Sequence, residues 1–442
     1  MSRRAAFAIS LLLGAGLCGC AVYRPAPLDG AADAVLTQPD LGAALTAARP
    51  KPVAIDLGQP LTPESLGLIA VVTNPDLKAA RAKAKVADAQ VFDAGLLPDP
   101  SITLGTDQLL SGPDPTNAFT GQVAVDLNAL RTRNVARRIA GRARDQVRYD
   151  LAWQEWQTAG QARLLAARIA GLGQVLALDE AARDITARTL TRTLAAAARG
   201  DVKADDVEAR RIAAAEASDR ARQAERDFDA ARLDLNRLLG VRPETVIRIA
   251  TPTAEPAEGA LDAEALFARA RADRLDLRAL QAGYDSQEAV TRKAVMDQFP
   301  NLQLTVSRAQ DTADNQTIGP SVNFTLPVWN RNAGGIAIAK ATRGQLRAEY
   351  AARLFSTRAD IAELVEGLTL ARHQRAEMAA QVGPLSKIAA ATQGAIARGD
   401  IAQATGEAAR ASIADKQLAL AGLDQAIAEQ TIALELAVGA PL

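Results

Sequence analysis

The chain has 442 residues, which is enough for two or more domains, and 48% of them are hydrophobic while only 3% are aromatic. Much of the apolar content is Ala and Leu, which is typical of long helices. Lys+Arg and Asp+Glu each number 51, so the net charge gives no sign of a nucleic-acid-binding surface. With one His and two Cys, a site built from several His and Cys ligands is excluded.

Residues 1–19 predict a lipoprotein signal peptide. Two arginines precede an apolar stretch, Ala5–Leu17, which is too short for a membrane-spanning helix. The following Leu-Cys-Gly-Cys resembles a bacterial lipobox, with Cys20 as the lipidated residue. Ala21 after that cysteine implies sorting to the outer membrane. We therefore expect a lipid anchor on Cys20 and no other cofactor; an ordinary signal peptide cleaved elsewhere is the alternative.

Residues 20–61 predict an extended N-terminal arm, because prolines recur there and each proline removes a backbone donor and restricts φ. Beyond this arm the sequence is duplicated. Short motifs recur in the same order at an offset of 200 or 199 residues, as in Asp76-Leu77 with Asp276-Leu277, and Gly200-Asp201 with Gly399-Asp400. The predicted units are repeat 1 at 62–240, a linker at 241–261 and repeat 2 at 262–442.

Each repeat begins with two predicted helices. Thr62 before Pro63, and Asp262 in the second copy, have the form of helix N-caps. The second helices are expected at about 75–96 and 275–297, where prolines stop them.

A pair of strands follows in each repeat, at about 101–108 and 119–127, and at about 302–309 and 318–326. Apolar and polar residues alternate along them, which places the two classes on opposite faces of a sheet. The polar class includes Gln122, Asp126, Gln303 and Asn323.

Each repeat ends in a long antiparallel helical hairpin, predicted at about 134–239 and 333–438. Gly200 and Gly399 suit the left-handed residue that ends a helix, and Asp201 and Asp400 suit the start of the return helix. A helical run of about 66 residues at 1.5 Å each extends for about 100 Å, so it must pack laterally.

Four strands with an apolar and a polar face cannot close on themselves, because small barrels need about eight strands. Unpaired strand edges in a membrane cost several kcal/mol for each backbone group, so several chains must complete the wall. A polar face with Gln122, Asp126, Gln303 and Asn323 suits a wide, wet lumen, and favours twelve strands over eight.

From residue 62 to the C-terminus the order of motifs resembles the outer membrane efflux (TolC-like) family. The run Leu326–Ile336 is similar to the strand-to-helix junction of its heavy-metal (CzcC- and CusC-like) branch, whereas Leu127–Arg133 lacks the glycines usual there. The resemblance implies a mainly α fold with a β-barrel part. It also implies a homotrimer with a 12-stranded outer-membrane barrel, in contact with outer-membrane lipid, and a periplasmic helical barrel. The implied function is passive exit from a tripartite system with a periplasmic adaptor and an inner-membrane pump, of the RND type.

The hairpin tips are the predicted regulatory site. Charged residues cluster there, and we expect Arg–Asp pairs between neighbouring tips to bias a periplasmic gate toward closure: Arg199, Asp201, Asp205, Asp206, Arg398 and Asp400. The resemblance implies adaptor docking at the same turns, with Gly200, Val202, Gly399 and Ile401. Ordinary cap-and-turn chemistry is the alternative explanation of these charges.

Two other functions compete with a channel. A periplasmic coiled-coil structural lipoprotein would form no pore, and a carboxylate-based hydrolase would need paired acids in a pocket, whereas the acids here fall on helix faces and turns. The sequence has no Gly-rich phosphate loop with its lysine, so ATP hydrolysis by that route is excluded. The cargo stays open between metal ions, drugs and peptides.

Overall fold

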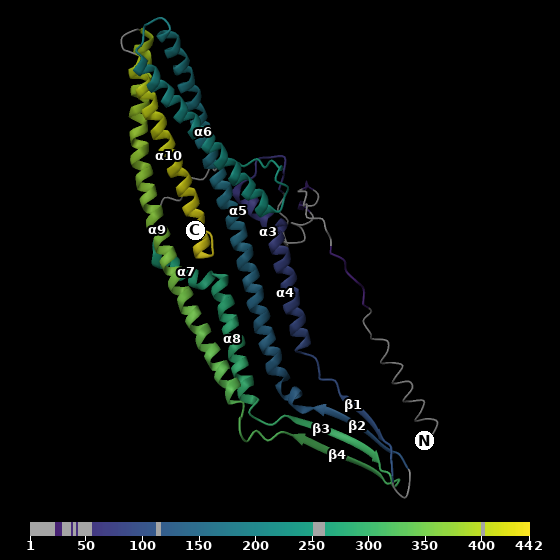
Figure 1. The fold of residues 1–442 in the computed structure, drawn as a ribbon. Coiled ribbons are helices and arrows are strands. Elements are labelled where there is room, and N and C mark those ends of the chain that lie inside the picture. Colours follow the sequence, from purple (N-terminus) through teal and green to yellow (C-terminus); the bar gives the residue numbers. More distant parts are fainter. Residues whose placement is uncertain are drawn as a thin grey trace. The chain divides into compact units, whose positions relative to one another are not determined.

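The computed structural model describes residues 23–28, 37–38, 41–42, 55–111, 116–250, 261–398 and 403–442 (Figure 1). The chain divides into two units, 1–35 and 36–442. In the first unit, residues 23–28 have no regular secondary structure. The predicted signal peptide and the lipidation site Cys20 lie outside the described residues.

In the second unit, one order of elements occurs twice: two helices, two strands, a long helix and a return helix. The first set is α3 (Pro63–Thr73), α4 (Pro75–Asp93), β1 (Ser101–Asp107), β2 (Ala118–Asp126), α5 (Leu127–Ala197) and α6 (Ala204–Leu239). The second set is α7 (Ala263–Asp273), α8 (Leu275–Met296), β3 (Leu302–Gln310), β4 (Gln316–Phe324), α9 (Ala333–Arg398) and α10 (Gln403–Val438).

The short helices start at the caps that the sequence indicates. The Thr62 hydroxyl accepts a hydrogen bond from the Ser65 amide at 3.2 Å, and Asp262 accepts from the Glu264 amide at 2.9 Å. Pro63 stands at the first position of α3, where its missing N–H leaves no bond unmade. Local sequence therefore decides where both helices begin.

The long helices differ in how they begin. α5 starts at Leu127, directly after β2, and not near residue 134, so Leu127 is helical and not the last residue of a strand. The reason is Asp126, whose Oδ1 accepts from the amides of Asn128 and Ala129 at 2.8 and 3.1 Å. The 71 residues of α5 extend for about 105 Å. None of the described helices has a segment long and apolar enough to cross a membrane.

Before α9 the chain makes a turn that α5 does not need. β4 ends at Phe324, and Arg331 and Asn332 have left-handed φ values of 45° and 52°. The side-chain Nδ2 of Asn332 donates to the Ala294 carbonyl of α8 at 2.8 Å. A Cβ on Gly335 would lie 2.5 Å from the Oδ1 of the same side chain. Gly335 therefore leaves room for the Asn332 side chain. The first copy makes no such turn, because Asp126 caps α5 directly after β2, and it needs no glycine there.

The four strands form one antiparallel sheet in the order β1-β2-β3-β4. The central pair, β2 with β3, joins the two halves of the chain in a register that places Val123 opposite Val306. β4 spans 316–324, two residues earlier than the 318–326 expected. Figure 1 shows the sheet where β2 runs into α5.

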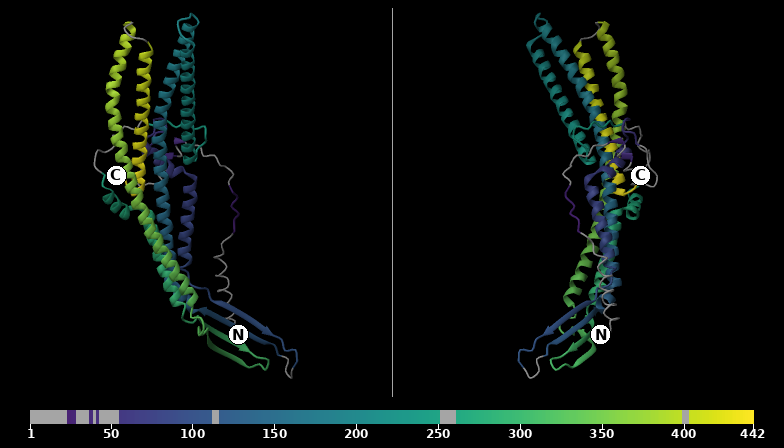
Figure 2. Two further views of the ribbon diagram at one scale, coloured as in Figure 1. Left: turned by 60° about the vertical axis from the view of Figure 1, so that its left-hand side comes forward. Right: turned by 90° about the vertical axis from the view of Figure 1, so that its right-hand side faces the viewer.

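The helices pack around α5, which contacts α3, α4, α6, α8 and α10, while α9 packs on α7, α8 and α10. Each half has a separate apolar core where its short helix meets the long hairpin. The first core includes Leu41, Leu66, Ile69, Leu235 and Leu239; the second includes Leu266, Ile361, Leu368, Leu434 and Val438. Leu41 lies in the segment predicted to be an extended arm, and residues 38, 41 and 42 are helical. The views in Figure 2 show the two long hairpins and the sheet from other sides.

Glycines bring the two halves together. A Cβ on Gly160 of α5 would overlap the side chain of Leu436 in α10, and one on Gly171 would lie 2.7 Å from Gln425. Arg163 also binds Glu435 of α10 at 2.6 Å. Close approach of α5 and α10 therefore depends on residues without a side chain, as in other tightly packed helix pairs.

Candidate functional site

The sheet has one polar and one apolar face, because residues that pair directly across an antiparallel ladder point to the same side. Asp126 pairs with Gln303, and Gln303 pairs with Asn323. Gln122 is four residues from Asp126 on the same strand, so it lies on the same face. The structure thus brings together the four polar strand residues singled out in the sequence.

The apolar side chains of the opposite face are left uncovered by the described chain. Ile102, Leu104, Val123, Val306, Ile318 and Phe324 are all exposed, with Leu104 at 70% and Ile318 at 76%. On the polar face, Ala124 and Thr305 are 8% and 4% exposed. This is the reverse of a sheet in water, where the apolar face is the covered one.

The sheet also ends in two open edges. Within the described residues, β1 pairs only with β2 and β4 pairs only with β3. An exposed edge is a row of unpaired backbone donors and acceptors, which another strand can join.

Arg199 and Asp201 pair within the first hairpin tip. Gly200 has φ +83°, as a helix-ending residue requires, and α5 ends just before it. Arg199 Nε donates to Asp201 Oδ2 at 2.9 Å, with both side chains well exposed.

The return helix of this tip begins without the predicted aspartate cap. Asp201 lies before α6, whose N-cap is Lys203 with no side-chain cap bond. Val202 is in the turn, and Asp205 and Asp206 lie in the first turn of α6, where acids favour the helix dipole.

The second tip is described in part. Arg398 is the last residue of α9, and α10 resumes at Gln403. The predicted tip residues Gly399, Asp400 and Ile401 lie outside the described residues.

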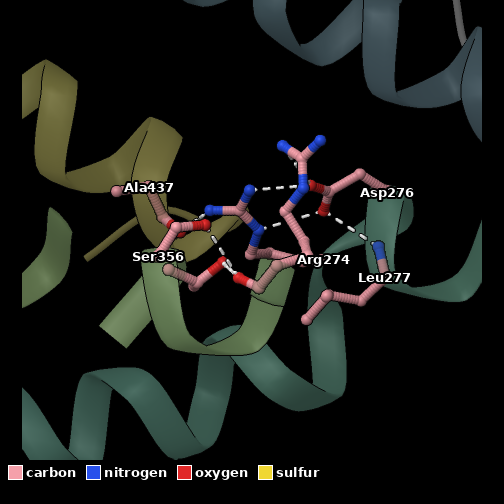
Figure 3. Close-up of polar contacts among 7 residues, drawn as sticks. Arg274, Asp276, Leu277, Ser356 and Ala437 are labelled. Atoms are coloured by element: carbon pink, nitrogen blue, oxygen red, sulfur yellow. Dashed lines mark hydrogen bonds and ion pairs between the residues drawn. The ribbon is translucent and has the colours of Figure 1, made fainter. Parts of the chain in front are cut away.

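A buried ionic cluster joins the helix ends of the second half, and the sequence gives no sign of it (Figure 3). Arg274, between α7 and α8, donates to Asp276 at 3.0 and 2.7 Å and to the Ala437 carbonyl of α10 at 2.7 Å. The side chains of Arg274 and Asp276 are 7% and 10% exposed. The guanidinium stacks over Trp153 of α5 at 4.7 Å, and Arg353 of α9 lies 3.7 Å from Asp276. The cluster therefore fixes α8, α9, α10 and α5 relative to one another.

The first half closes the corresponding place with a neutral side chain. The side-chain Nδ2 of Asn74 donates to the Leu238 carbonyl of α6 at 2.8 Å, and its Oδ1 accepts from the backbone N–H of Leu77 at 2.9 Å. Glycines in left-handed conformations, Gly240 and Gly439, follow the two return helices. Asn74 and Arg274 correspond at the offset of 200 residues, and Leu238 and Ala437 at the offset of 199, so the two bonds occupy equivalent places in the two repeats.

One buried carboxylate has an unpartnered oxygen. Asp179 of α5 is 6% exposed, and its Oδ1 accepts no hydrogen bond. Burial raises the pKa of Asp179, and the charge of Arg220 on α6 opposes that rise. In the part of the chain that the structure describes, no group of three or more His, Cys, Asp or Glu is placed to hold a metal ion.

Comparisons with known proteins agree with this architecture. Residues 266–440 match the family model for outer membrane efflux proteins. No curated protein matches the sequence.

Solved structures share the fold at low identity. The Campylobacter jejuni CmeC outer membrane channel has a TM-score of 0.72 and 14% identity, covering 95% of this chain and 95% of that one. CusC, described for folding and transmembrane channel formation, has a TM-score of 0.70 and 15% identity, covering 86% of this chain and 92% of that one. The Neisseria gonorrhoeae MtrE outer membrane channel has a TM-score of 0.64 and 18% identity, covering 86% and 89%.

The resemblance stated from the sequence is confirmed at this level: residues 266–440 match the family model for outer membrane efflux proteins, and the fold that contains them is shared with these solved channels.

Proposed function

We propose that the chain is an outer-membrane channel subunit that provides a passive exit duct for an efflux system. One observation carries the proposal: a sheet whose large apolar residues lie bare on one face, whose polar residues gather on the other, and whose two edges are open. Such a sheet is stable in a bilayer when its apolar face meets lipid and its edges are closed by other strands. The match of residues 266–440 to the efflux family supports the same function.

The subunit is proposed to act as a homotrimer. Four strands from each of three copies give a twelve-stranded wall, in which Gln122, Asp126, Gln303 and Asn323 face water. The Asp126 carboxylate also caps α5, so one of its oxygens is already bound to backbone amides. The predicted outer-membrane location, with a lipid anchor on Cys20 and the helices in the periplasm, belongs to this proposal.

Planar bilayer recording tests the proposal directly. The purified full chain is expected to elute as a trimer in detergent and to give discrete conductance steps in a bilayer. A matched control is Ile102→Asn/Leu104→Asn, which places polar groups on the apolar face and is expected to abolish insertion. Only a monomer without conductance, from a preparation with intact helical and β signal, contradicts the channel and favours a structural lipoprotein.

The gate at the hairpin tips is part of the proposal. In the first tip Arg199 binds Asp201 of the same turn. Exposed pairs contribute about 0–1 kcal/mol each, so several pairs in a ring bias a gate without locking it. Arg199→Gln and Asp400→Ala are expected to raise single-channel conductance, whereas Arg188→Gln, on the same helix away from the turn, is not. Unchanged conductance in the tip variants rejects the gate and leaves cap-and-turn chemistry.

Partners and cargo are proposed from the family alone. The tips, with Gly200 and Val202 in one and Gly399 and Ile401 in the other, are the expected docking sites for a periplasmic adaptor that links the channel to an inner-membrane pump. Growth of a deletion strain on zinc, cobalt, cadmium, copper and several drugs identifies the cargo. Sensitivity to metals alone supports the heavy-metal branch, and sensitivity to drugs alone contradicts it.

A further inference from the structure

A positively charged groove lies between α5 and α8, close to the sheet. Its volume is about 770 Å³, and Arg138 and Arg142 of α5 face Asp285, Glu288, Arg292 and Val295 of α8 across it. α5 begins directly after β2, and α8 ends at Met296 shortly before β3. The groove is therefore on the part of the helices that adjoins the strands.

The charges in the groove do not cancel. Glu288 is already bound by Arg343 at 3.3 Å and by the Tyr284 hydroxyl at 3.0 Å. Asp285 lies 3.8 Å from Arg142.

Among the described residues, no acidic side chain forms an ion pair with Arg138 or Arg292, and both are exposed. Two guanidinium groups thus remain available, and their planar donor forks match phosphate oxygens.

Exposed apolar residues follow the groove along the chain toward the sheet. Val295 lines the groove and is 44% exposed, and Phe299 and Leu302 follow along the chain with exposed side chains. Leu302 pairs with Phe324 on the apolar face of the sheet. The groove therefore suits a ligand with an anionic head and an apolar tail.

A neighbouring copy is not placed to fill the groove. Near the sheet the helices contact one another in the order α4, α5, α8 and α9, so α5 and α8 are the inner pair. A laterally associated copy meets α4 or α9, and the space between α5 and α8 stays accessible.

We propose that this groove binds the headgroup of an anionic phospholipid, with the phosphate held by Arg138 and Arg292 and an acyl chain running along Val295, Phe299 and Leu302. The inference rests on the proposed function, because it requires the sheet to stand in a bilayer. It gives the junction of strands and helices a second role, which is to fix the depth of the channel in the membrane.

Native mass spectrometry of the purified full chain in detergent tests the site. Phosphatidylglycerol is titrated against the native protein, with phosphatidylethanolamine as the zwitterionic comparison and glycerol 3-phosphate as the headgroup without a tail. The Arg138→Gln/Arg292→Gln variant is expected to lose about tenfold in phosphatidylglycerol affinity, since two charge-assisted bonds to phosphate are removed. The Arg138→Lys/Arg292→Lys variant keeps the charge and is expected to retain most of the binding.

The control is Arg188→Gln/Arg192→Gln, which also removes two exposed arginines, both in α5 and far from the groove. Its phosphatidylglycerol affinity is expected to be unchanged. Equal losses in both Gln variants, no loss in either, or equal affinity for phosphatidylethanolamine overturn the proposal. Glycerol 3-phosphate binding as tightly as the lipid identifies a soluble phosphate as the ligand and also overturns it.

Conductance recorded on the same preparations separates this inference from the proposed function. The Arg138→Gln/Arg292→Gln variant is expected to conduct like the native chain. A native chain that binds phosphatidylglycerol through these arginines without conducting contradicts the channel alone, whereas a conducting chain without lipid selectivity contradicts the groove alone.

Discussion

The two halves of the chain close the end of their helical hairpins with different chemistry. In the first half, Asn74 binds the Leu238 carbonyl and caps α4 with one neutral side chain. In the second half, Arg274 binds the Ala437 carbonyl, but its charge is buried and needs Asp276 beside it. The same backbone problem has been solved once with an amide and once with an ion pair. The buried ion pair makes contacts that the amide does not, from Arg274 to Trp153 of α5 and from Asp276 to Arg353 of α9. In return, each buried charge depends on the other for its stability.

The largest effect is expected from removing that partner. Asp276→Asn leaves Arg274 buried without a counter-ion, which costs about 3–5 kcal/mol. The free energy of unfolding, from guanidinium denaturation followed by circular dichroism, measures the loss. Asp273→Asn, an exposed acid close to it in the chain, is the control and is expected to have almost no effect. A small loss at Asp276 means that water and the Ala437 carbonyl are enough to accommodate the charge of Arg274.

The glycines after the return helices give the next effect. Gly439 has φ +80°, and a Cβ there would lie 2.9 Å from Arg274 Cγ and 3.2 Å from its Cα, so Gly439→Ala strains the backbone and displaces the arginine. The expected cost is about 1–3 kcal/mol. Gly200→Ala is the control, because Gly200 has φ +83° but a Cβ there would meet no atom within 4 Å. Equal losses of thermal stability in the two variants would show that the Arg274 contact is unimportant.

The neutral closure is expected to be less costly to remove. Asn74→Ala loses the cap of α4 and the bond to the Leu238 carbonyl, at about 1–2 kcal/mol. Asn74→Asp keeps the cap but no longer donates, so it separates the two contributions. Denaturation midpoints of the two variants measure them. If Asn74→Ala proves as damaging as Asp276→Asn, the two closures do not differ in the way proposed.

The smallest effect has the opposite sign. Burial raises the pKa of Asp179, so the folded chain binds a proton there more readily than the unfolded chain does, and stability falls as pH rises through the interval between the two pKa values. Asp179→Asn removes that loss and is expected to stabilise the protein at pH 7 by about 1 kcal/mol, since one oxygen of the carboxylate has no partner.

The gain at Asp179 is expected to disappear below pH of about 4, where the native carboxyl is also neutral. Thermal unfolding at pH 7 and at a pH of about 3.5 checks both conditions. Destabilisation at pH 7 would mean that Asp179 depends on Arg220 as Arg274 depends on Asp276.

Much of this architecture follows from local sequence. Alternation of side chains along 101–107 and 302–310 specifies strands with two faces, because successive residues point to opposite sides. Thr62 and Asp262 cap the helices that follow them, and Gly200 takes the left-handed conformation expected of it. These features depend only on residues within a few positions of one another. The sequence pattern predicts too late a start for α5, because Asp126 has a capping role that its place in an alternating strand conceals.

Contacts between residues far apart in the sequence depend on the folded chain. Arg274 in the sequence is one arginine among many, and its bond to Ala437 spans 163 residues. Gly160 and Gly171 lie inside α5 although glycine is a poor helix former, and the close approach of α10 explains why neither position has a side chain. The groove likewise exists because two helices lie side by side while Arg138 and Arg292 find no acid among the described residues. Caps, turns and strand alternation depend on neighbouring residues, so they can be read from the sequence. Hydrogen bonds, close packing and charge compensation between elements depend on atoms that are near only in space, so they follow from the folded chain.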